Sequence, residues 1–159
     1  MTKTKVKSKP ASDRSTVIMT ELVLPQHTNA LGTIFGGVIM GWVDIAAAIA
    51  CTRYARSPVV TVSVDSLSFL QPVKLGHTVI IEARVTYTGK TSMEVEVTVW
   101  GEIGTEGTKF KTTQAYLTFV AIDSKGGPID VPPFIPDTKD EKERYIAAKK
   151  RREHRLSLR

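Results

Sequence analysis

The stretch GGVIMGWVDIAAAIAC, residues 36–51, constrains the fold of this chain more than any other segment. It contains fifteen uncharged residues, most of them apolar or small, and a single carboxylate, that of Asp44. No proline interrupts residues 36–54, and an uninterrupted run of this length suits a helix better than a strand. A Ser-Pro pair at positions 57 and 58 then ends the connection. The pattern predicts one long, largely apolar helix inside the folded body.

Strand patterns dominate the sequence after this helix. Apolar residues occupy every second position in four segments, as expected of strands with one buried face. These segments cover residues 60–69, 79–87, 93–99 and 115–121. The alternation slips by one position at Asp65 and Ser66, which indicates a β-bulge. An earlier apolar run at residues 16–25 is the candidate for a fifth strand.

Short turns join the last three of these segments, so they should form an antiparallel meander. One long helix with about five antiparallel strands predicts an α+β domain over residues 15–130, in which the sheet wraps the helix. Residues 1–14 are predicted to be a basic, flexible N-terminal tail. Residues 131–159 are predicted to be a proline-rich connector followed by a basic helix, held by its few apolar residues, Tyr145, Ile146 and Ala148.

The net charge of +6 at pH 7 is concentrated at the two ends of the chain. Residues 1–14 carry five basic residues and one acidic residue, and residues 138–159 carry nine basic and four acidic residues. The intervening residues 15–137 therefore have eight basic and eleven acidic residues, a net charge of −3. This body lacks the basic patches with interleaved aromatic residues that nucleic-acid platforms use, so we expect no nucleic-acid partner.

The remaining composition narrows the class of protein further. A single cysteine, Cys51, excludes a disulfide framework and a zinc cluster, and it is expected to be plain core. The basic N-terminus is not followed by the apolar stretch of a secretory signal, so a cytoplasmic location is expected. Asp44 interrupts the best candidate for a membrane-spanning segment, so no membrane span is expected.

Asp44 is unusual because it places a charged side chain in the middle of an otherwise apolar helix. Residues 37, 41, 44 and 48 share one helix face, so Asp44 should stand over Gly37 and Gly41 in a groove lined by small residues. An unpaired buried carboxylate costs several kcal/mol. Asp44 is therefore either satisfied by structural hydrogen bonds or exposed to a site, and the helix pattern alone leaves both possibilities open.

The loop before the helix, PQHTNALGTIFGG, favours a site. It places polar groups at Gln26, His27, Thr28 and Asn29 ahead of a helix N-terminus, whose free backbone N–H groups can hold developing negative charge. Oxyanion donors, a group that positions water and a base are what attack of water on an acyl carbonyl requires. No GxSxG nucleophile motif occurs.

The distance between Gly37 and Asp44 along the helix indicates a site shared by two subunits. Gly37 and Asp44 are seven residues apart, about 10 Å along the axis, so one carbonyl is not expected to contact both in the same chain. A homodimer, in which the helix end of one chain faces the aspartate of the other, would bring them together.

The segment PQHTNALGTIFGGVIMGWVD resembles the signature of hotdog-fold acyl-CoA thioesterases, in the branch of cytosolic long-chain acyl-CoA hydrolases and their bacterial relatives. The later segment VDSLSFLQPVKLGHTVIIEARVTYTGKTSMEVEVTVW is also similar to that family, and the resemblance covers about residues 12–130. It implies a sheet wrapped around the long helix, dimers that join their sheets edge to edge, and assembly as a hexamer of three dimers. It implies hydrolysis of fatty acyl-CoA without a metal or cofactor, coenzyme A being part of the substrate.

The resemblance also implies roles for individual residues. Asp44 would act as general base on water or attack the thioester directly, Asn29 of the facing subunit would hold the water or the carbonyl, and the Gly37 amide would polarise the thioester oxygen. Coenzyme A would lie across Gly89, Lys90, Thr91 and Ser92, whose other interpretation is an ordinary hairpin turn. The acyl tail would contact Phe69, Met40 and Trp42, which are also ordinary core types.

Several alternatives remain open from the sequence. His27 and Asp44 could form the pair of an acyl-thioester hydratase or dehydratase of the same fold, although the loop lacks the proline pattern of those enzymes. A non-catalytic acyl-CoA-binding regulator is the other alternative. The basic residues of the C-terminal helix could reach the ribose phosphate of coenzyme A or remain solvated; they are Arg144, Lys149, Lys150, Arg151 and Arg152.

Overall fold

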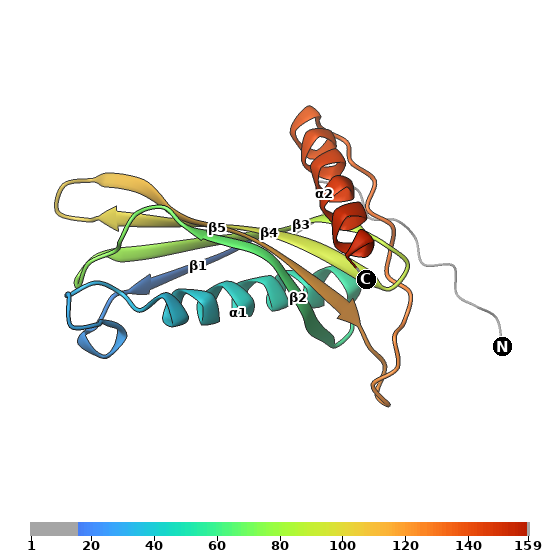
Figure 1. The fold of residues 1–159 in the computed structure, drawn as a ribbon, viewed down its shortest axis with the longest axis horizontal. Helices are drawn as coiled ribbons and strands as arrows, with labels where there is room; N and C mark the ends of the chain where they lie inside the picture. The colour runs from blue at the N-terminus through green and yellow to red at the C-terminus, as the bar shows by residue number, and fades with distance from the viewer. Residues whose placement is uncertain (1–15, 159) are drawn as a thin grey trace.

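The computed structural model describes residues 16–158. The predicted basic tail at residues 1–14 lies outside the described residues. Two helices and five strands follow one another along the chain (Figure 1): β1 (Val17–Leu22), α1 (Gly36–Ala55), β2 (Val59–Phe69), β3 (Thr78–Thr88), β4 (Ser92–Ile103), β5 (Thr108–Ala121) and α2 (Lys139–Ser157), with a short 3₁₀ turn at Pro25–His27 before α1.

The five strands form one antiparallel sheet in the order β1-β3-β4-β5-β2. The meander of β3, β4 and β5 is confirmed, and β1 and β2 are the two edges. Helix α1 lies along one face of this sheet and α2 crosses the other face (Figure 1). The predicted α+β architecture is therefore confirmed.

Strand β2 contains two bulges. Its pairing with β5 shifts register between Val64 and Ser66, as predicted, and also between Thr61 and Ser63, where the sequence alternation shows no break. In a regular strand Thr61 and Ser63 would share one face, whereas one extra residue between them puts them on opposite faces. Thr61 consequently faces α1, and Asp65 faces α2.

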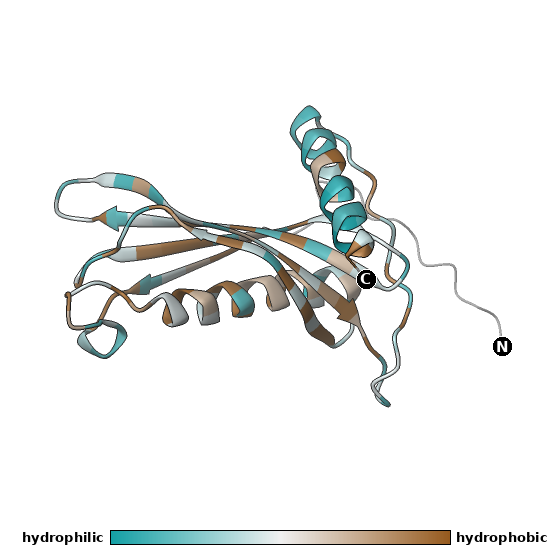
Figure 2. Ribbon diagram, viewed as in Figure 1, coloured by the Kyte–Doolittle hydropathy of each residue, from teal (hydrophilic) through white to brown (hydrophobic). Residues whose placement is uncertain are grey.

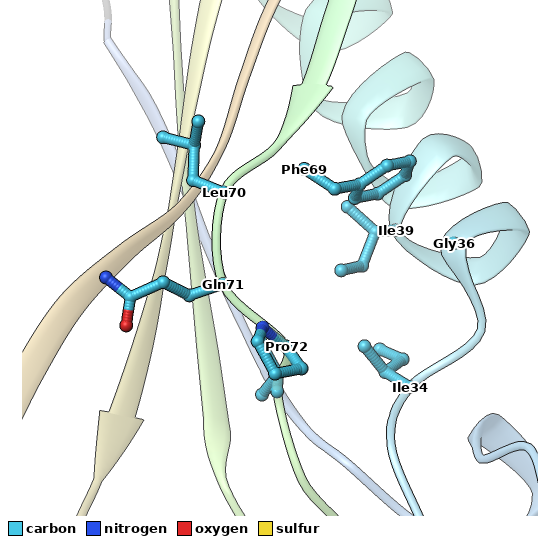
Figure 3. A pocket seen from close by; sticks show the side chains of 8 residues that line it. Ile34, Gly36, Ile39, Phe69, Leu70, Gln71 and Pro72 are labelled. Atoms are coloured by element: carbon cyan, nitrogen blue, oxygen red, sulfur yellow. The ribbon is translucent and has the colours of Figure 1, made fainter. Parts of the chain in front are cut away.

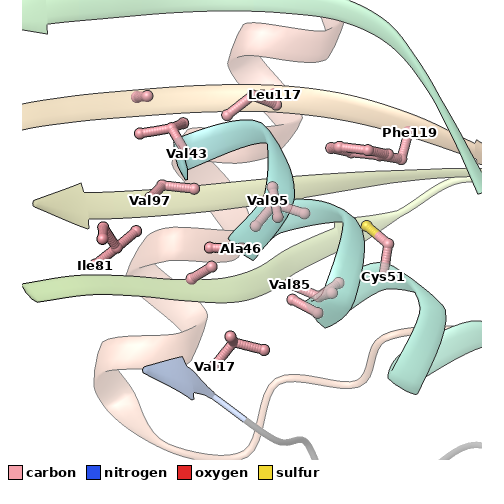
Figure 4. Packing of buried hydrophobic residues seen from close by; sticks show 14 of the residues in the cluster. Val17, Val43, Ala46, Cys51, Ile81, Val85, Val95, Val97, Leu117 and Phe119 are labelled. Carbon is pink, nitrogen blue, oxygen red and sulfur yellow. The ribbon is translucent and has the colours of Figure 1, made fainter. Parts of the chain in front are cut away.

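The core lies between α1 and the sheet (Figure 4). The buried positions of α1 are mostly small or β-branched, which lets the helix approach the inward-facing valines of β3 and β4 closely; they are Ile39, Val43, Ala46, Ala47, Ala50, Cys51 and Tyr54. Cys51 is fully buried, and burial raises the pKa of its thiol far above the usual value. A protonated, inaccessible thiol is not a nucleophile, in agreement with its assignment to the core.

α1 is also long and apolar enough to cross a membrane by length and composition, in spite of Asp44. The expectation that Asp44 alone excludes α1 by composition is therefore wrong, because one carboxylate is outweighed by the apolar residues around it. The core helix of a soluble protein passes the same test. In this structure α1 contacts all five strands.

Helix α2 docks on the sheet through ion pairs as well as through apolar contacts. It is hydrophilic along most of its length (Figure 2) and covers a polar layer on the outer face of the sheet, where Glu94 and Glu96 are buried. Its three sheet-facing arginines reach carboxylates: Arg144 pairs with Glu96, Arg151 with Glu94 and Arg155 with Asp65. Asp140 accepts a further hydrogen bond from Arg144 at 2.7 Å.

The predicted apolar contacts of α2 are only partly right. Ala148 is fully buried, and the ring of Tyr145 packs against Tyr87 and Phe134 at centroid distances of 4.9 and 6.1 Å. Ile146 is 56% exposed, so its predicted contact is wrong. Positions 145 and 148 are three residues apart and share a face, whereas position 146 is turned about 100° away from 145.

Candidate functional site

Asp44 projects from the middle of α1 toward the edge strand β2. The Thr61 hydroxyl donates a hydrogen bond of 2.7 Å to Asp44 Oδ1, and Thr61 itself is exposed. Asp44 is only partly buried, so it is both hydrogen-bonded within the chain and open to a site. The reason is its position: β2 is the last strand of the sheet, and no residue between 16 and 158 covers the helix face beside it.

The face of α1 that carries Asp44 is open. Gly37 and Gly41 are both exposed, and no described residue outside the local backbone of α1 comes within 4 Å of the place that a Cβ would occupy on either residue. The predicted groove of small residues is therefore present in the protomer. It leaves the Asp44 carboxylate accessible to water or to a ligand from the side of Gly41.

The N-terminus of α1 offers free hydrogen-bond donors at one end of this face. The N-cap residue, Phe35, gives no side-chain hydrogen bond, although Ser, Thr, Asp or Asn is preferred at such a position. Within residues 16–158, the amides of Gly36 and Gly37 donate to no acceptor. Unpaired amides at a helix N-terminus favour an oxyanion or another negatively charged group.

Asn29 and His27 are engaged within their own loop. Asn29 Oδ1 accepts from the Leu31 amide at 2.9 Å, and its Nδ2 donates to Thr33 Oγ1 at 3.0 Å. His27 Nδ1 accepts from the Leu24 amide, and its ring packs edge-on against Trp42 at 5.1 Å. Among the described residues, no hydrogen bond joins Asn29 or His27 to Asp44. One protomer therefore brings Gly37 near this loop but does not bring Asn29 to Asp44.

A pocket of about 330 Å³ lies beside the N-terminal end of α1 (Figure 3). Its wall is mainly apolar and is made by the first turn of α1, the end of β2 and the segment that follows β2: Ile34, Gly36, Ile39, Phe69, Leu70, Gln71, Pro72 and Val73. The Phe69 ring lies 3.1 Å from the place of a Cβ on Gly36, so a side chain at position 36 would require this ring to shift. A pocket of this kind suits an extended apolar group.

The three residues predicted to contact an acyl chain are not brought together. Phe69 lines this pocket. Met40 is 46% exposed on α1 outside it, and Trp42 packs against His27 instead. Helix geometry explains the division, because residues 39, 40 and 42 point in three different directions around α1.

The four residues predicted to hold coenzyme A form the turn between β3 and β4. The Gly89 amide donates to the Ser92 carbonyl at 2.8 Å. Lys90 is exposed, and Thr91 and Ser92 are partly exposed. The turn is therefore a hairpin turn in its backbone, with its cation and hydroxyls accessible to a ligand.

The sequence itself places the chain among known proteins. The sequence profile of the thioesterase superfamily matches residues 31–108. The Bacillus subtilis protein named uncharacterized acyl-CoA thioester hydrolase YkhA is 41% identical over 127 residues, which are 80% of this chain and 74% of that protein. The chain belongs to the thioesterase superfamily. Solved thioesterases agree with this assignment.

An apo-hexameric acyl-CoA thioesterase is 42% identical, with a TM-score of 0.91 over 96% of this chain and 97% of that chain. The acyl-CoA hydrolase of Staphylococcus aureus, solved with butyryl coenzyme A and coenzyme A, is 37% identical, with a TM-score of 0.87 over 95% and 92% of the two chains. The expected hotdog fold is confirmed by these neighbours.

The Staphylococcus aureus thioesterase has also been solved with alanine at an asparagine, an aspartate and a threonine. These three residues are spaced by fifteen and then seventeen positions along that chain. Asn29, Asp44 and Thr61 have the same spacing here.

Thr61 is the site residue that the sequence analysis missed. In the sequence, Thr61 is one of several polar residues that alternate with valines. The bulge at position 62 turns Thr61 toward α1, and the sequence pattern does not reveal this bulge. The pocket residues other than Phe69 were missed as well, because they come from two stretches that lie about thirty residues apart in the sequence, residues 34–39 and 69–73. No group of three or more His, Cys, Asp or Glu side chains within residues 16–158 could hold a metal ion.

Proposed function

We propose that this thioesterase hydrolyses fatty acyl-CoA to a free fatty acid and coenzyme A. The observation that carries the proposal is an accessible Asp44 carboxylate, held by Thr61, on an open helix face that begins with two unpaired amides. Water is the only co-reactant, so no cofactor is required. The names of the relatives and neighbours support the substrate class.

The proposed active site lies between two protomers. Asn29 and Asp44 are both needed in this proposal but are not joined within one chain, and the helix face between them is uncovered. The adjoining edge strand exposes valines at positions 60, 62 and 64, which a second β2 strand could cover. We therefore expect a homodimer that places Asn29 of one chain near Asp44 of the other. The hexameric neighbour supports three such dimers.

Two chemical roles for Asp44 are compatible with this arrangement. As general base, Asp44 takes a proton from the attacking water while the Gly37 amide stabilises the thioester oxygen. As nucleophile, Asp44 attacks the thioester carbon and releases the thiolate of coenzyme A, and water then cleaves the anhydride. Rapid-quench kinetics separates them, because only the nucleophilic route allows coenzyme A to appear before the fatty acid.

Replacing Thr61 with valine should reduce kcat by about 10-fold, because a hydrogen bond of about 1.5 kcal/mol to a charged group would no longer orient the Asp44 carboxylate. Thr61 acts here as a positioning residue. Thr61→Ser keeps the hydroxyl and should restore most of the rate, which a loss of packing would not allow. Equal rates for Thr61→Val and the wild type would remove Thr61 from the mechanism.

The pocket beside Gly36 is proposed to hold the acyl chain. Its volume is about twice that of an apolar cavity of about 150 Å³ that holds benzene, so roughly a dozen carbons would fit. Phe69→Ala should enlarge it and raise kcat/KM for hexadecanoyl-CoA relative to octanoyl-CoA by about 10-fold or more, because each methylene of fit matters.

Met40→Ala is the matched comparison, because Met40 lies outside this pocket. A change of chain-length preference in Met40→Ala and none in Phe69→Ala would place the acyl chain along the open helix face instead.

A free-thiol assay with several acyl-CoAs tests the proposed reaction directly. Release of coenzyme A with one equivalent of fatty acid supports hydrolysis. Addition of water to an enoyl-CoA without thiol release would show a hydratase, and tight binding without turnover would show a regulator. Either of these two results would contradict the proposal.

A further inference from the structure

The basic residues of α2 fall into two groups. The three arginines that face the sheet, Arg144, Arg151 and Arg155, are neutralised there by Glu96, Glu94 and Asp65. Arg152 differs, since it makes no ion pair or side-chain hydrogen bond with any residue between 16 and 158, and it is only partly exposed. A guanidinium held near the surface without an acceptor is available to an anion.

Arg152 lies against the turn between β3 and β4. Its Nε and Nη2 atoms are each 3.6 Å from the place that a Cβ would occupy on Gly89. The C-terminal end of α2 lies beside this turn in Figure 1. A side chain at position 89 would meet the guanidinium and would also lie 2.8 Å from Ser92 Oγ. Glycine at this position therefore keeps the space between Arg152 and Ser92 open.

The turn supplies further groups that suit a phosphate. Lys90 is exposed, and the hydroxyls of Thr91 and Ser92 make no hydrogen bond to a described residue. The backbone is fixed, because the Lys90 carbonyl accepts from the Val131 amide at 2.9 Å and the Thr91 carbonyl accepts from the Ala121 amide at 3.0 Å. Two cations and two hydroxyls thus surround a rigid turn, which is the donor set that phosphate oxygens accept.

The position of this turn relative to Asp44 fits a long substrate. Thr61, which holds Asp44, pairs with Phe119 of β5, and Phe119 pairs with Met93 of β4, directly after Ser92. Thr61 and Met93 are therefore separated by two strand spacings across the sheet, about 10 Å. The phosphates of coenzyme A are separated from its thioester by the pantetheine arm, which can cover such a separation around the end of the sheet.

We infer that Arg152 binds a phosphate group of coenzyme A and makes the enzyme favour thioesters that carry this phosphate. The inference rests on the proposed function and extends it to a residue of the C-terminal helix. The phosphate is either the 3′-phosphate of the ribose or the pyrophosphate, which have the same chemistry toward a guanidinium. Arg144 and Arg151, which are paired with carboxylates, do not take this role.

Calorimetric titration of the full chain with coenzyme A tests the inference. Arg152→Ala should weaken binding of coenzyme A by about 10-fold to 100-fold, the loss expected for hydrogen bonds to a charged group, and Arg152→Lys should weaken it less. Lys142→Ala is the matched control, because it removes one exposed positive charge from the same helix far from the turn. It should bind coenzyme A as the wild type does.

Two truncated ligands identify the phosphate. If Arg152 contacts the 3′-phosphate, Arg152→Ala and the wild type should bind dephospho-coenzyme A equally. If it contacts the pyrophosphate, Arg152→Ala should weaken binding of dephospho-coenzyme A but not of pantetheine, which carries no phosphate.

Unchanged affinity of Arg152→Ala for coenzyme A, in an enzyme that hydrolyses acyl-CoA, would overturn the role of Arg152 alone. An equal loss in Lys142→Ala would also overturn it, because the effect would then be one of net charge. A wild-type chain that neither hydrolyses acyl-CoA nor binds coenzyme A would show instead that the proposed function is wrong.

Discussion

Asp44→Asn is expected to lower kcat for acyl-CoA hydrolysis by about 100-fold to 10,000-fold, the range that loss of a general base produces. Asparagine keeps the size of the side chain and can still accept the Thr61 hydrogen bond, so the local structure should survive. It cannot take a proton from water or form an anhydride with the acyl group. The measurement is steady-state release of free thiol at saturating acyl-CoA.

Asp130→Asn provides the matched control, because this exposed aspartate lies just before the connector and its side chain makes no hydrogen bond to a residue between 16 and 158. Its kcat should equal that of the wild type, and both variants should melt within a few degrees of the wild type. A wild-type rate in Asp44→Asn would exclude Asp44 as base and as nucleophile, and the proposed mechanism would fail with it.

The largest effect on stability is expected at the contact between α2 and the sheet. Arg151 donates two hydrogen bonds to Glu94, at 2.8 and 3.1 Å, and its guanidinium stacks 3.7 Å over the Tyr116 ring. The Glu94 side chain is only 3% exposed. Arg151→Met should therefore cost about 3 kcal/mol, because it leaves a buried carboxylate without its cation. Urea denaturation at a fixed protein concentration measures this loss.

Amide hydrogen exchange of Arg151→Met shows which part of the structure loses stability. If α2 detaches and lets water reach Glu94, its amides should exchange faster while those of β4 remain protected. The double variant Arg151→Met with Glu94→Gln should recover part of the stability, because no charge is then left buried. Lys142→Met, at an exposed position of the same helix, should change stability by less than about 0.5 kcal/mol. Equal stability of Arg151→Met and the wild type would show that this ion pair contributes nothing to docking.

Local sequence patterns predicted the central features of the fold. The helix expected at residues 36–54 is α1, Gly36–Ala55, and the alternating segments are strands of one antiparallel sheet. These predictions succeed because helix and strand periods are properties of neighbouring residues. The groove at Gly37 and Gly41 was predictable for the same reason, since it depends on one helix face alone.

The sequence by itself thus determined which elements form, which faces they bury and that one carboxylate stands in a line of small residues. Only the tertiary structure decided that a bulge turns Thr61 toward Asp44, that Phe69 closes over Gly36, and that, among the described residues, Arg151 has a carboxylate partner while Arg152 has none. Each of these contacts joins residues far apart in the chain. Their geometry depends on strand register and on helix docking, and neither leaves a periodic signal in the sequence.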